Sequence, residues 1–160
     1  MNSNIIFINI ILDEKMRNVI KLWSAGGVVI KNDKILICYR KNQNLFCLPK
    51  GTPELGENIE ETAIREVSEE TGLVPKILSK IGENNYEFYK KSTDKRYEKN
   101  IIYKKTVYFF LMAVTGGDIK NHDHEFDKVL WMSLEKSKEK LTYNNEFSIV
   151  EKAFFAQKKD

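Results

Sequence analysis

One strongly acidic segment sets much of what this chain can form. Seven acidic residues stand between residues 54 and 70, against a single arginine. Asn58 is of a residue type favoured at the N-cap of a helix, and Gly72 is of the type that most often follows the last turn. We therefore predict a helix that is capped by Asn58, runs to about Thr71 and stops at Gly72.

Three glutamates of this predicted helix are spaced so that they converge. At about 100° per residue, Glu66, Glu69 and Glu70 stand at positions i, i+3 and i+4 and share one face. Carboxylates this close repel one another by roughly a few tenths of a kcal/mol per pair unless a cation neutralises them. Oxygen ligands on a rigid element suit Mg²⁺, or Mn²⁺ in its place. A solvated, glutamate-rich helix face is the alternative that this spacing alone leaves open.

A basic segment balances the acidic one. Seven lysines and arginines stand between Lys90 and Lys105, against two acids. The net charge of +3 is therefore the sum of two opposed segments, and its small size argues against nucleic acid as a partner. Two such segments in one small domain suggest a site that handles cations and anions together, although solvated surface stretches are the alternative.

The rest of the chain is typical of one α/β domain with a mixed sheet and few helices. The predicted strands cover residues 23–30, 34–40, 74–81, 85–89, 101–114 and 129–132. Ser133 opens a short helix. Asn144 or Asn145 is expected to cap a final amphipathic helix, and this helix should bury apolar side chains on one face. Those side chains are Phe147, Val150 and Phe154.

Residues 1–21 precede this pattern and are predicted to be an N-terminal extension or an extra strand, with the main domain over residues 22–160. The apolar run over residues 5–12 is far too short to span a bilayer, and no basic residues precede it as in a secretory signal. The two cysteines, Cys38 and Cys47, stand in no metal-binding or disulfide-rich spacing. We expect a protein of the reducing cytoplasm with no membrane partner.

The acidic helix is part of a longer pattern with fixed spacing. Gly51 is followed after five residues by Glu57, and after seven more by residues 65–73, R-E-V-S-E-E-T-G-L. All nine fixed positions over these 23 residues match the Nudix box, G-x5-E-x7-R-E-U-x-E-E-x-G-U, in which U is aliphatic. The chain therefore resembles the Nudix hydrolases, which are MutT-like enzymes, over about residues 22–158.

This resemblance implies a fold and a reaction. The fold would be an α/β/α sandwich with a mixed central sheet. The reaction would be Mg²⁺-dependent cleavage of a diphosphate linked to another moiety, commonly a nucleoside, by attack of water on phosphorus. At matching positions, the three converging glutamates would hold the metal ions, with the Gly51 carbonyl as a further ligand. Arg65 would orient these glutamates by ion pairing, and Glu57 would brace the loop or stand in the outer shell of the metal site.

The resemblance leaves the general base open between two residues, because members of the family use either a glutamate of the box or one from a later loop. Glu66 is the candidate within the box. Glu125, just before the last predicted strand, is the other candidate and the one that we favour. The neighbouring His122 and His124 are expected to be solvated loop residues.

Local similarities outside the box point to the branch of the family that hydrolyses diadenosine tetraphosphate. Tyr89 lies sixteen residues after the box, where dinucleoside polyphosphate hydrolases of the family carry a tyrosine. Residues 48–51, L-P-K-G, resemble the lead-in to the box in that branch, and residues 130–131 and 141–143 are similar in style to its ending. The predicted substrate is therefore a dinucleoside polyphosphate such as diadenosine tetraphosphate.

A bridge of four or five phosphates carries more negative charge than metal ions alone neutralise, and adenine needs a stacking surface. The candidate phosphate contacts are Lys50, Lys104 and Lys105, with Arg96 or Lys99 as further candidates. The candidate stacking residues are Tyr86, Phe88, Tyr89 and Tyr143. Each aromatic residue has ordinary strand or core packing as its alternative.

Two other functions remain open at this point. One is a housecleaning pyrophosphatase of damaged or non-canonical nucleoside triphosphates, with the same metals and a tighter pocket for a single base. The other is a non-catalytic Nudix domain that senses a nucleotide, although the intact glutamates argue against it. The oligomeric state is left open between monomer and homodimer, and the number of metal ions is open as well.

Overall fold

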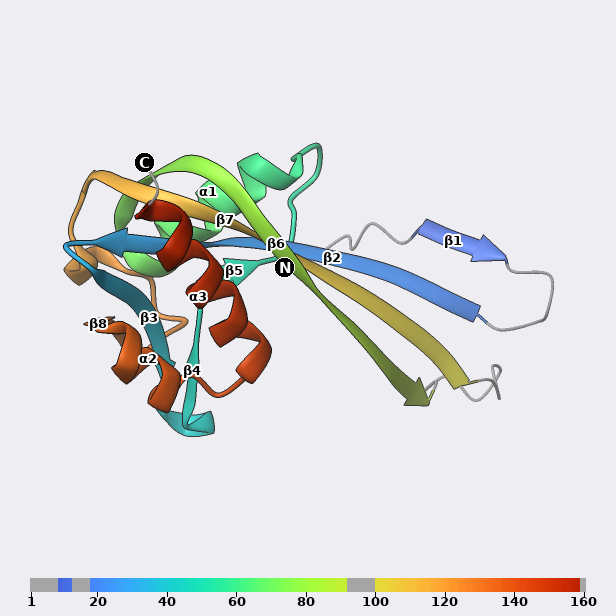
Figure 1. Ribbon diagram of the computed structural model, residues 1–160. Coiled ribbons are helices and arrows are strands. Elements are labelled where there is room, and N and C mark those ends of the chain that lie inside the picture. Colours follow the sequence, from blue (N-terminus) through green and yellow to red (C-terminus); the bar gives the residue numbers. More distant parts are fainter. Residues whose placement is uncertain (1–8, 13–17, 92–99, 159–160) are drawn as a thin grey trace.

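The computed structural model describes residues 9–12, 18–91 and 100–158 (Figure 1). The strands are β1 (Asn9–Leu12), β2 (Asn18–Lys31), β3 (Lys34–Arg40), β4 (Leu45–Cys47), β5 (Lys50–Gly51), β6 (Leu73–Lys91), β7 (Asn100–Gly117) and β8 (Lys128–Met132). The helices are α1 (Ile59–Thr71), α2 (Leu134–Lys140) and α3 (Asn144–Gln157), with short 3₁₀ turns η1 (Lys41–Gln43) and η2 (Ile119–Asn121).

β2 is the strand that joins the sheet together. The strand order is β4-β3-β2-β7-β6, while β1 and β5 pair along β2 and β8 pairs with β3. β2 and β7 run parallel, with Val19 opposite Ile102 and Val29 opposite Met112, and every other strand pair described is antiparallel. The predicted mixed sheet is therefore confirmed.

Alternate residues of the central strands supply two cores on opposite faces of the sheet. In β2, Val28 belongs to the core beneath α3, whereas Val29 belongs to the core beneath α1. In β7, Phe109 and Phe110 divide in the same way, as the two-residue period of a strand requires. Because helices cover both faces, the predicted α/β/α sandwich is confirmed. We call these faces the α1 face and the α3 face.

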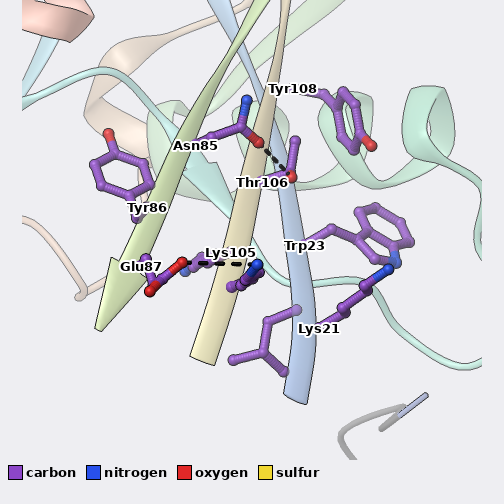
Figure 2. A pocket seen from close by; sticks show the side chains of 10 residues that line it. Lys21, Trp23, Asn85, Tyr86, Glu87, Lys105, Thr106 and Tyr108 are labelled. Carbon is purple, nitrogen blue, oxygen red and sulfur yellow. Dashed lines mark hydrogen bonds and ion pairs between the residues drawn. The ribbon is translucent and has the colours of Figure 1, made fainter. Parts of the chain in front are cut away.

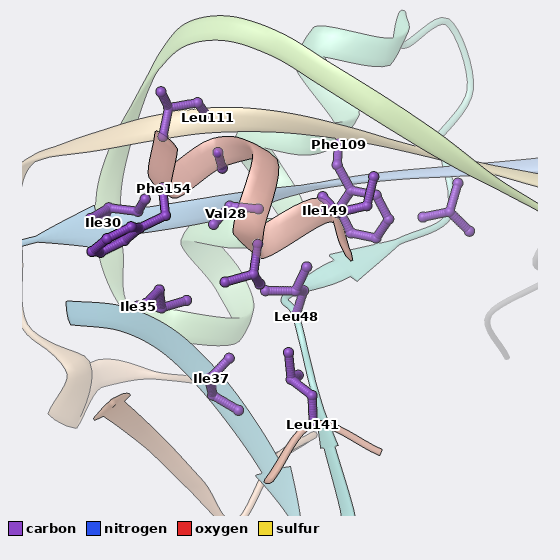
Figure 3. Close-up of a cluster of buried hydrophobic side chains, with 13 residues drawn as sticks. Val28, Ile30, Ile35, Ile37, Leu48, Phe109, Leu111, Leu141, Ile149 and Phe154 are labelled. Atoms are coloured by element: carbon purple, nitrogen blue, oxygen red, sulfur yellow. The ribbon is translucent and has the colours of Figure 1, made fainter. Parts of the chain in front are cut away.

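Figure 3 shows the core of the α3 face. Ile149 and Phe154 of α3 point onto the sheet, where they meet Val28 and Phe109 (Figure 3). The final helix is amphipathic as predicted, but Phe147 is only half-buried at the edge of this core, and Ile149 is the more deeply buried residue.

Three strands extend beyond the helices as a twisted ribbon (Figure 1). We call this ribbon the arm; it consists of residues 18–23 of β2, 85–91 of β6 and 100–106 of β7. β1 pairs with the outer end of β2, from Asn18 to Lys21. The sheet therefore begins before residue 22, and the segment predicted as an extension or extra strand does contain a strand.

Local signals explain why α1 forms where it does. The Asn58 side chain accepts a hydrogen bond from the Glu61 N–H at 2.9 Å, and the Glu61 carboxylate accepts one from the Asn58 N–H at 2.9 Å, so a complete capping box is present. Gly72 closes the helix with φ of 72°, a left-handed conformation that suits glycine. The predicted helix and both of its ends are confirmed.

Two sequence predictions were wrong in detail. Residues 74–81 and 85–89 belong to one continuous strand, β6. Its pairing register with β7 shifts between residues 74 and 75, between 77 and 79 and between 80 and 82. The N-cap of α3 is Tyr143 rather than Asn144 or Asn145. The reason is that Asn145 donates its side-chain N–H to the Tyr86 hydroxyl at 3.0 Å and is therefore engaged elsewhere.

Within the described ranges, no helix is long and apolar enough to cross a bilayer. Cys38 and Cys47 lie opposite each other on β3 and β4, and both are buried free thiols.

Candidate active site

The helix α1 holds two of its glutamates against β5. Its apolar residues Ala63 and Val67 are fully buried against the sheet, which fixes the direction of its other side chains. Glu70 is 1% exposed, and its Oε2 accepts a hydrogen bond from the Lys50 N–H at 2.8 Å. A Cβ atom at Gly51 would overlap the carboxylate of Glu66, so a glycine is required for this close approach.

Arg65 links the loop before α1 to the glutamates of the helix. Its Nε donates to Glu57 Oε1 at 2.6 Å, and its Nη2 donates to Glu57 Oε2 at 3.0 Å and to the Thr52 carbonyl at 2.8 Å. Its Nη1 lies 3.0 Å from Glu66 Oε1 and 3.1 Å from Glu69 Oε2. One guanidinium thus holds three carboxylates in place, as a rigid fork of donors can.

Glu57 is held entirely by groups of the loop and helix. Its carboxylate accepts hydrogen bonds from the Glu54 N–H and the Thr62 hydroxyl, each at 2.9 Å, in addition to those from Arg65. These hydrogen bonds, that from Arg65 above all, lower the pKa of Glu57 to about 2. In this arrangement the side chain of Glu57 braces the loop.

The negative charge of the remaining carboxylates is incompletely compensated. Burial raises the pKa of Glu70 to about 9, and the nearby charge of Glu125 adds to the rise. Burial also raises the pKa of Glu66, although Arg65 acts in the opposite direction. A hard divalent cation is the kind of group that stabilises such carboxylates in their ionised form.

The donors fit Mg²⁺ in chemistry, since they are carboxylates on a rigid helix beside a backbone carbonyl. The predicted convergence of three glutamates is nevertheless incomplete. Glu66 and Glu70 face β5, whereas Glu69 is 52% exposed and turned to Arg65. Over residues 9–12, 18–91 and 100–158, no group of three or more His, Cys, Asp or Glu side chains stands ready to hold a metal ion. The metal assignment stays a prediction.

Glu125 reaches the same region from the loop before β8. Arg40 Nη2 lies 2.5 Å from Glu125 Oε1, and Arg40 Nε donates to the Glu125 carbonyl at 3.2 Å. The Asp123 N–H donates to the Glu69 carbonyl at 3.0 Å, so the loop is docked on the end of α1. The charge of Glu125 also raises the pKa of Glu66, the other candidate general base.

A surface hollow of about 750 Å³ lies beside Glu125 and Arg40, with the residues of η1 along another side. His124 lines this hollow and is exposed. The Nδ1 atom of His122 instead lies 2.7 Å from the Asp123 carbonyl.

Lys50 has a partner that the sequence reasoning missed. Its Nζ lies 2.8 Å from Oε1 of Glu146, a fully buried residue in the first turn of α3. Glu146 Oε2 also accepts the Leu48 N–H at 2.9 Å. Burial works against the charge of Lys50, but the Glu146 carboxylate outweighs it and raises the pKa of the ammonium. An acid in the first turn of a predicted helix is too common a feature to have revealed this pair.

The other candidate lysines lie on the arm. Lys105 is half-buried, and burial together with the charge of Lys50 lowers its pKa. Among the described residues it has no ion-pair partner. Lys104 is exposed, and its Nζ lies 3.7 Å from Glu87 Oε2. Lys105 is thus the better placed of the two to meet an anion.

The candidate tyrosines lie further from the box. Tyr89 is 64% exposed, pairs with Ile102 and donates its hydroxyl to Glu87 at 3.0 Å. Along the sheet it is level with Val19 of β2, about 20 Å further along the strand direction than Gly51. Tyr143 is 49% exposed at the start of α3.

Two further aromatic candidates have packing partners. The Tyr86 hydroxyl accepts a hydrogen bond from Asn145, and the Phe88 ring stacks on Tyr103 with centroids 5.2 Å apart. The candidates Arg96 and Lys99 lie outside the described residues.

A cavity of about 600 Å³ lies at the base of the arm (Figure 2). Trp23 and Tyr108 line it on the α1 face of the sheet, whereas Tyr86 and Lys105 stand on the α3 face (Figure 2). The rings of Trp23 and Tyr108 meet edge to face with centroids 6.5 Å apart. No sequence pattern singled out this cavity, because its residues meet only when β2, β6 and β7 pair.

Sequence comparison gives matches over most of the chain. A family profile described as NUDIX domain matches residues 21–152. The putative mutator protein MutT4 of Mycobacterium tuberculosis is 39% identical over 140 residues, which is 81% of this chain and 53% of that protein. The ADP-ribose pyrophosphatase of Methanocaldococcus jannaschii is 37% identical over 103 residues, 62% of this chain and 55% of that protein. The chain thus spans about half the length of these two relatives.

Comparison with solved structures establishes the shared fold. A NUDIX hydrolase from Nitrosomonas europaea superposes with a TM-score of 0.65 at 20% identity, over 86% of this chain and 90% of that chain. An Ap4A hydrolase of C. elegans gives a TM-score of 0.61 at 21% identity, over 85% of this chain and 98% of that chain. The named relatives include a putative 8-oxo-dGTP diphosphatase of Bacillus subtilis as well, 29% identical over 70% of this chain and 68% of that protein, so the diadenosine tetraphosphate branch is not singled out.

Proposed function

Because this chain belongs to the Nudix family, we propose that it is a pyrophosphohydrolase that cleaves a phosphoanhydride bond in a nucleoside polyphosphate. The observation that carries this proposal is the set of box carboxylates held by Arg65 against β5, with Glu125 docked beside them. Such a set has no evident role in packing, since burial of Glu70 without a cation disfavours its charge.

In the proposed site, Glu66, Glu69 and Glu70 hold Mg²⁺ or Mn²⁺, with the Gly51 carbonyl as a further ligand. When bound, the metal supplies a lowered pKa for attacking water and neutralisation of phosphate oxygens. Arg65 keeps Glu66 and Glu69 oriented through its two contacts of 3.0 and 3.1 Å.

The general base of the proposed reaction is Glu125, with Glu66 as the alternative. Glu125 is about half exposed, so water reaches it, and Arg40 fixes the position of its carboxylate. Glu66 is instead packed on Gly51 and paired with Arg65, which leaves it less free to accept a proton.

The proposed phosphate contacts differ in their freedom to bind. Lys105 offers an ammonium that is not paired within the described part of the chain, whereas Lys50 shares its charge with Glu146. Lys50 therefore acts mainly by placing its backbone N–H on Glu70, and Lys105 contacts the phosphates directly.

For the substrate itself, we favour a dinucleoside polyphosphate such as diadenosine tetraphosphate. Lys104 and Tyr89 stand on one face of the arm and continue outward from the box along β7 and β6, which supports a substrate that extends along the arm. The second candidate is a housecleaning nucleoside triphosphate pyrophosphatase, which the names of the MutT4 and 8-oxo-dGTP relatives favour. A non-catalytic nucleotide sensor is the third, and the intact carboxylates weigh against it.

The test is hydrolysis of a nucleotide panel with Mg²⁺, with products identified by chromatography. ATP released from diadenosine tetraphosphate would support the first candidate, and a monophosphate with pyrophosphate from a triphosphate would support the second. Tight nucleotide binding without turnover would contradict the proposed activity and favour a sensor. Gel filtration of the same preparation would decide between monomer and homodimer. We also propose that the protein is located in the cytoplasm.

A further inference from the structure

The cavity at the base of the arm lies mainly on the face of the sheet that carries helix α1. Trp23 and Tyr108 pack against the core that also contains Val67 of α1, so their side chains stand on the α1 face. Thr106 is two residues from Tyr108 on β7 and therefore stands on the same face. The cavity and the carboxylates of α1 thus share one side of the sheet.

The side chains of the cavity are arranged in rows across three strands. Trp23 lies opposite Thr106, and Thr106 lies opposite Asn85. The next row outward ends the cavity with three charged side chains, those of Lys21, Lys104 and Glu87. The volume of about 600 Å³ is within the range of cavities that hold small ligands.

Trp23 provides the largest aromatic surface of the cavity, and Tyr108 holds its ring in place. The two rings meet edge to face with centroids 6.5 Å apart, and Lys80 Nζ lies 4.8 Å from the centroid of the Tyr108 ring. In the described part of the chain, no other ring and no cation lies over the indole of Trp23. The half-buried indole therefore offers a ligand a fixed aromatic surface.

Beside the indole, Thr106 and Asn85 form an acceptor and a donor at fixed positions. Thr106 Oγ1 donates to Asn85 Oδ1 at 2.7 Å, a bond drawn as a dashed line in Figure 2. Because its hydrogen is used in this bond, the Thr106 hydroxyl can only accept from a ligand. Asn85 Nδ2 has no partner among the described residues and can donate to one. An acceptor beside a donor matches the polar edge of a nucleobase, such as the N6–H and N7 of adenine.

The cavity is adjacent to the carboxylate site along β2. Ala25 stands two residues from Trp23 on the same face and pairs with Gly51, the residue against which Glu66 packs. Two residues of a strand span about 7 Å, a distance that a ribose and its 5′-phosphate bridge. A nucleotide with its phosphate at Gly51 therefore has its base at Trp23. Tyr89, about 20 Å from Gly51 along the strand direction, is too distant for the same base.

We propose that this cavity binds the nucleobase of the nucleoside next to the box, stacked on Trp23 with its polar edge on Thr106 and Asn85. Stacking supplies most of the affinity, because every base has a π face, and the two polar side chains orient the ring. In a dinucleotide, Tyr89 is left for the second base. This inference rests on the proposed function, because it assumes a phosphate at the carboxylate site.

The fluorescence of Trp23 reports the proposed stacking directly. The chain has two tryptophans, so Trp131→Phe leaves Trp23 as the one indole. AMP with Mg²⁺ should quench this fluorescence, whereas ribose 5-phosphate, which lacks a base, should not. AMP has no anhydride bond, so the signal does not depend on turnover. If Trp131→Phe lowers the Tm, the difference between the wild type and Trp23→Phe gives the same signal. An equal response to both ligands would overturn the inference.

Calorimetric titration with AMP and Mg²⁺ measures the contribution of each side chain. Trp23→Ala should weaken binding about tenfold or more, and Trp23→Phe, which keeps a ring, by about threefold or less. Thr106→Val keeps the shape of the side chain but loses the hydroxyl, and it should weaken binding about fivefold. The matched controls are Phe155→Ala, an exposed ring on α3, and Thr115→Val, an exposed hydroxyl on β7, and both should bind as the wild type does. Wild-type affinity in a folded Trp23→Ala variant would contradict the proposed site.

These binding measurements keep the inference distinct from the proposed activity. If the wild-type protein hydrolyses no nucleotide but AMP quenches Trp23 and binds weakly to Trp23→Ala, the proposed activity fails and the base site stands. If the protein hydrolyses nucleotides while Trp23→Ala retains the wild-type affinity for AMP and the wild-type KM, the base site fails alone.

Discussion

Glu70 is the most deeply buried carboxylate of the box, and its replacement isolates charge from shape. In Glu70→Gln the amide oxygen can still accept the Lys50 N–H and the buried side chain keeps its shape, so the fold should survive with a nearly unchanged Tm. Since a glutamine binds Mg²⁺ poorly, kcat should fall by several orders of magnitude. Steady-state kinetics and thermal unfolding measure the two effects. Near-normal kcat would refute the metal assignment, and Glu60→Gln, an exposed position on α1, is the control.

The lowered pKa of Lys105 predicts that KM changes with pH in the alkaline range. Its pKa is lowered by burial and by Lys50, so its positive charge is lost at a lower pH than that of an ordinary lysine. Because the proposed role is binding of phosphate, KM should rise as the pH passes this pKa while kcat changes little. Lys105→Arg, whose charge persists to higher pH, should delay the rise in KM. The profile should be unaffected by Lys128→Arg, an exposed position on β8, and a flat wild-type profile would contradict the assignment.

At the scale of elements, the loop between β5 and α1 depends on the pair of Glu57 and Arg65. The pKa of Glu57 is lowered from 4.5 to about 2, so the pair stabilises the fold above pH 4.5 and loses this effect as the pH falls toward 2. Glu57→Gln should therefore reduce the free energy of unfolding at neutral pH by up to about 3 kcal/mol. Its difference from the wild type should shrink progressively below pH 4.5.

Denaturant unfolding at several pH values measures this effect. Glu60→Gln, at an exposed position in the first turn of α1 without a bond to Arg65, should show no comparable dependence on pH. A constant difference between Glu57→Gln and the wild type from pH 7 to pH 2.5 would mean that the ion pair contributes nothing to stability.

At the scale of elements, the sequence predicts a helix or strand well where its signals are local. Helix α1 was predictable to both ends because its signals, the capping box and Gly72, are local. The N-cap of α3 was not, because the competing partner of Asn145 is Tyr86, a residue of a distant strand. The role of Glu146 was not predictable for the same reason, since its burial and its pair with Lys50 arise only from tertiary contacts.

For the whole molecule, the coverage of the sheet by helices changes along the length of its strands. Near residues 25–30 and 107–112, helices cover the sheet and the strands are almost fully buried. Beyond Tyr86, which is bonded to Asn145 of α3, the strands of the arm continue without a helix over either face (Figure 1). Amide hydrogens of residues 19–23 and 102–106 should therefore exchange faster than those of the covered segments, as measured by mass spectrometry. Equal protection along β2 and β7 would show that the arm shares the stability of the two cores.

The parallel pairing of β2 with β7 also determines when the fold can be completed. β2 and β3 form a hairpin, and α1 carries its own caps, so these parts can form from neighbouring residues. The two cores, however, both contain residues of β7, which leaves the ribosome long after β2. Joining strands so distant in the chain closes a long loop before its contacts compensate for the lost entropy, and this step should limit the rate of folding. A nascent chain that stops short of Asn100 would hold every residue of the acidic box and still lack the strand that unites its two cores.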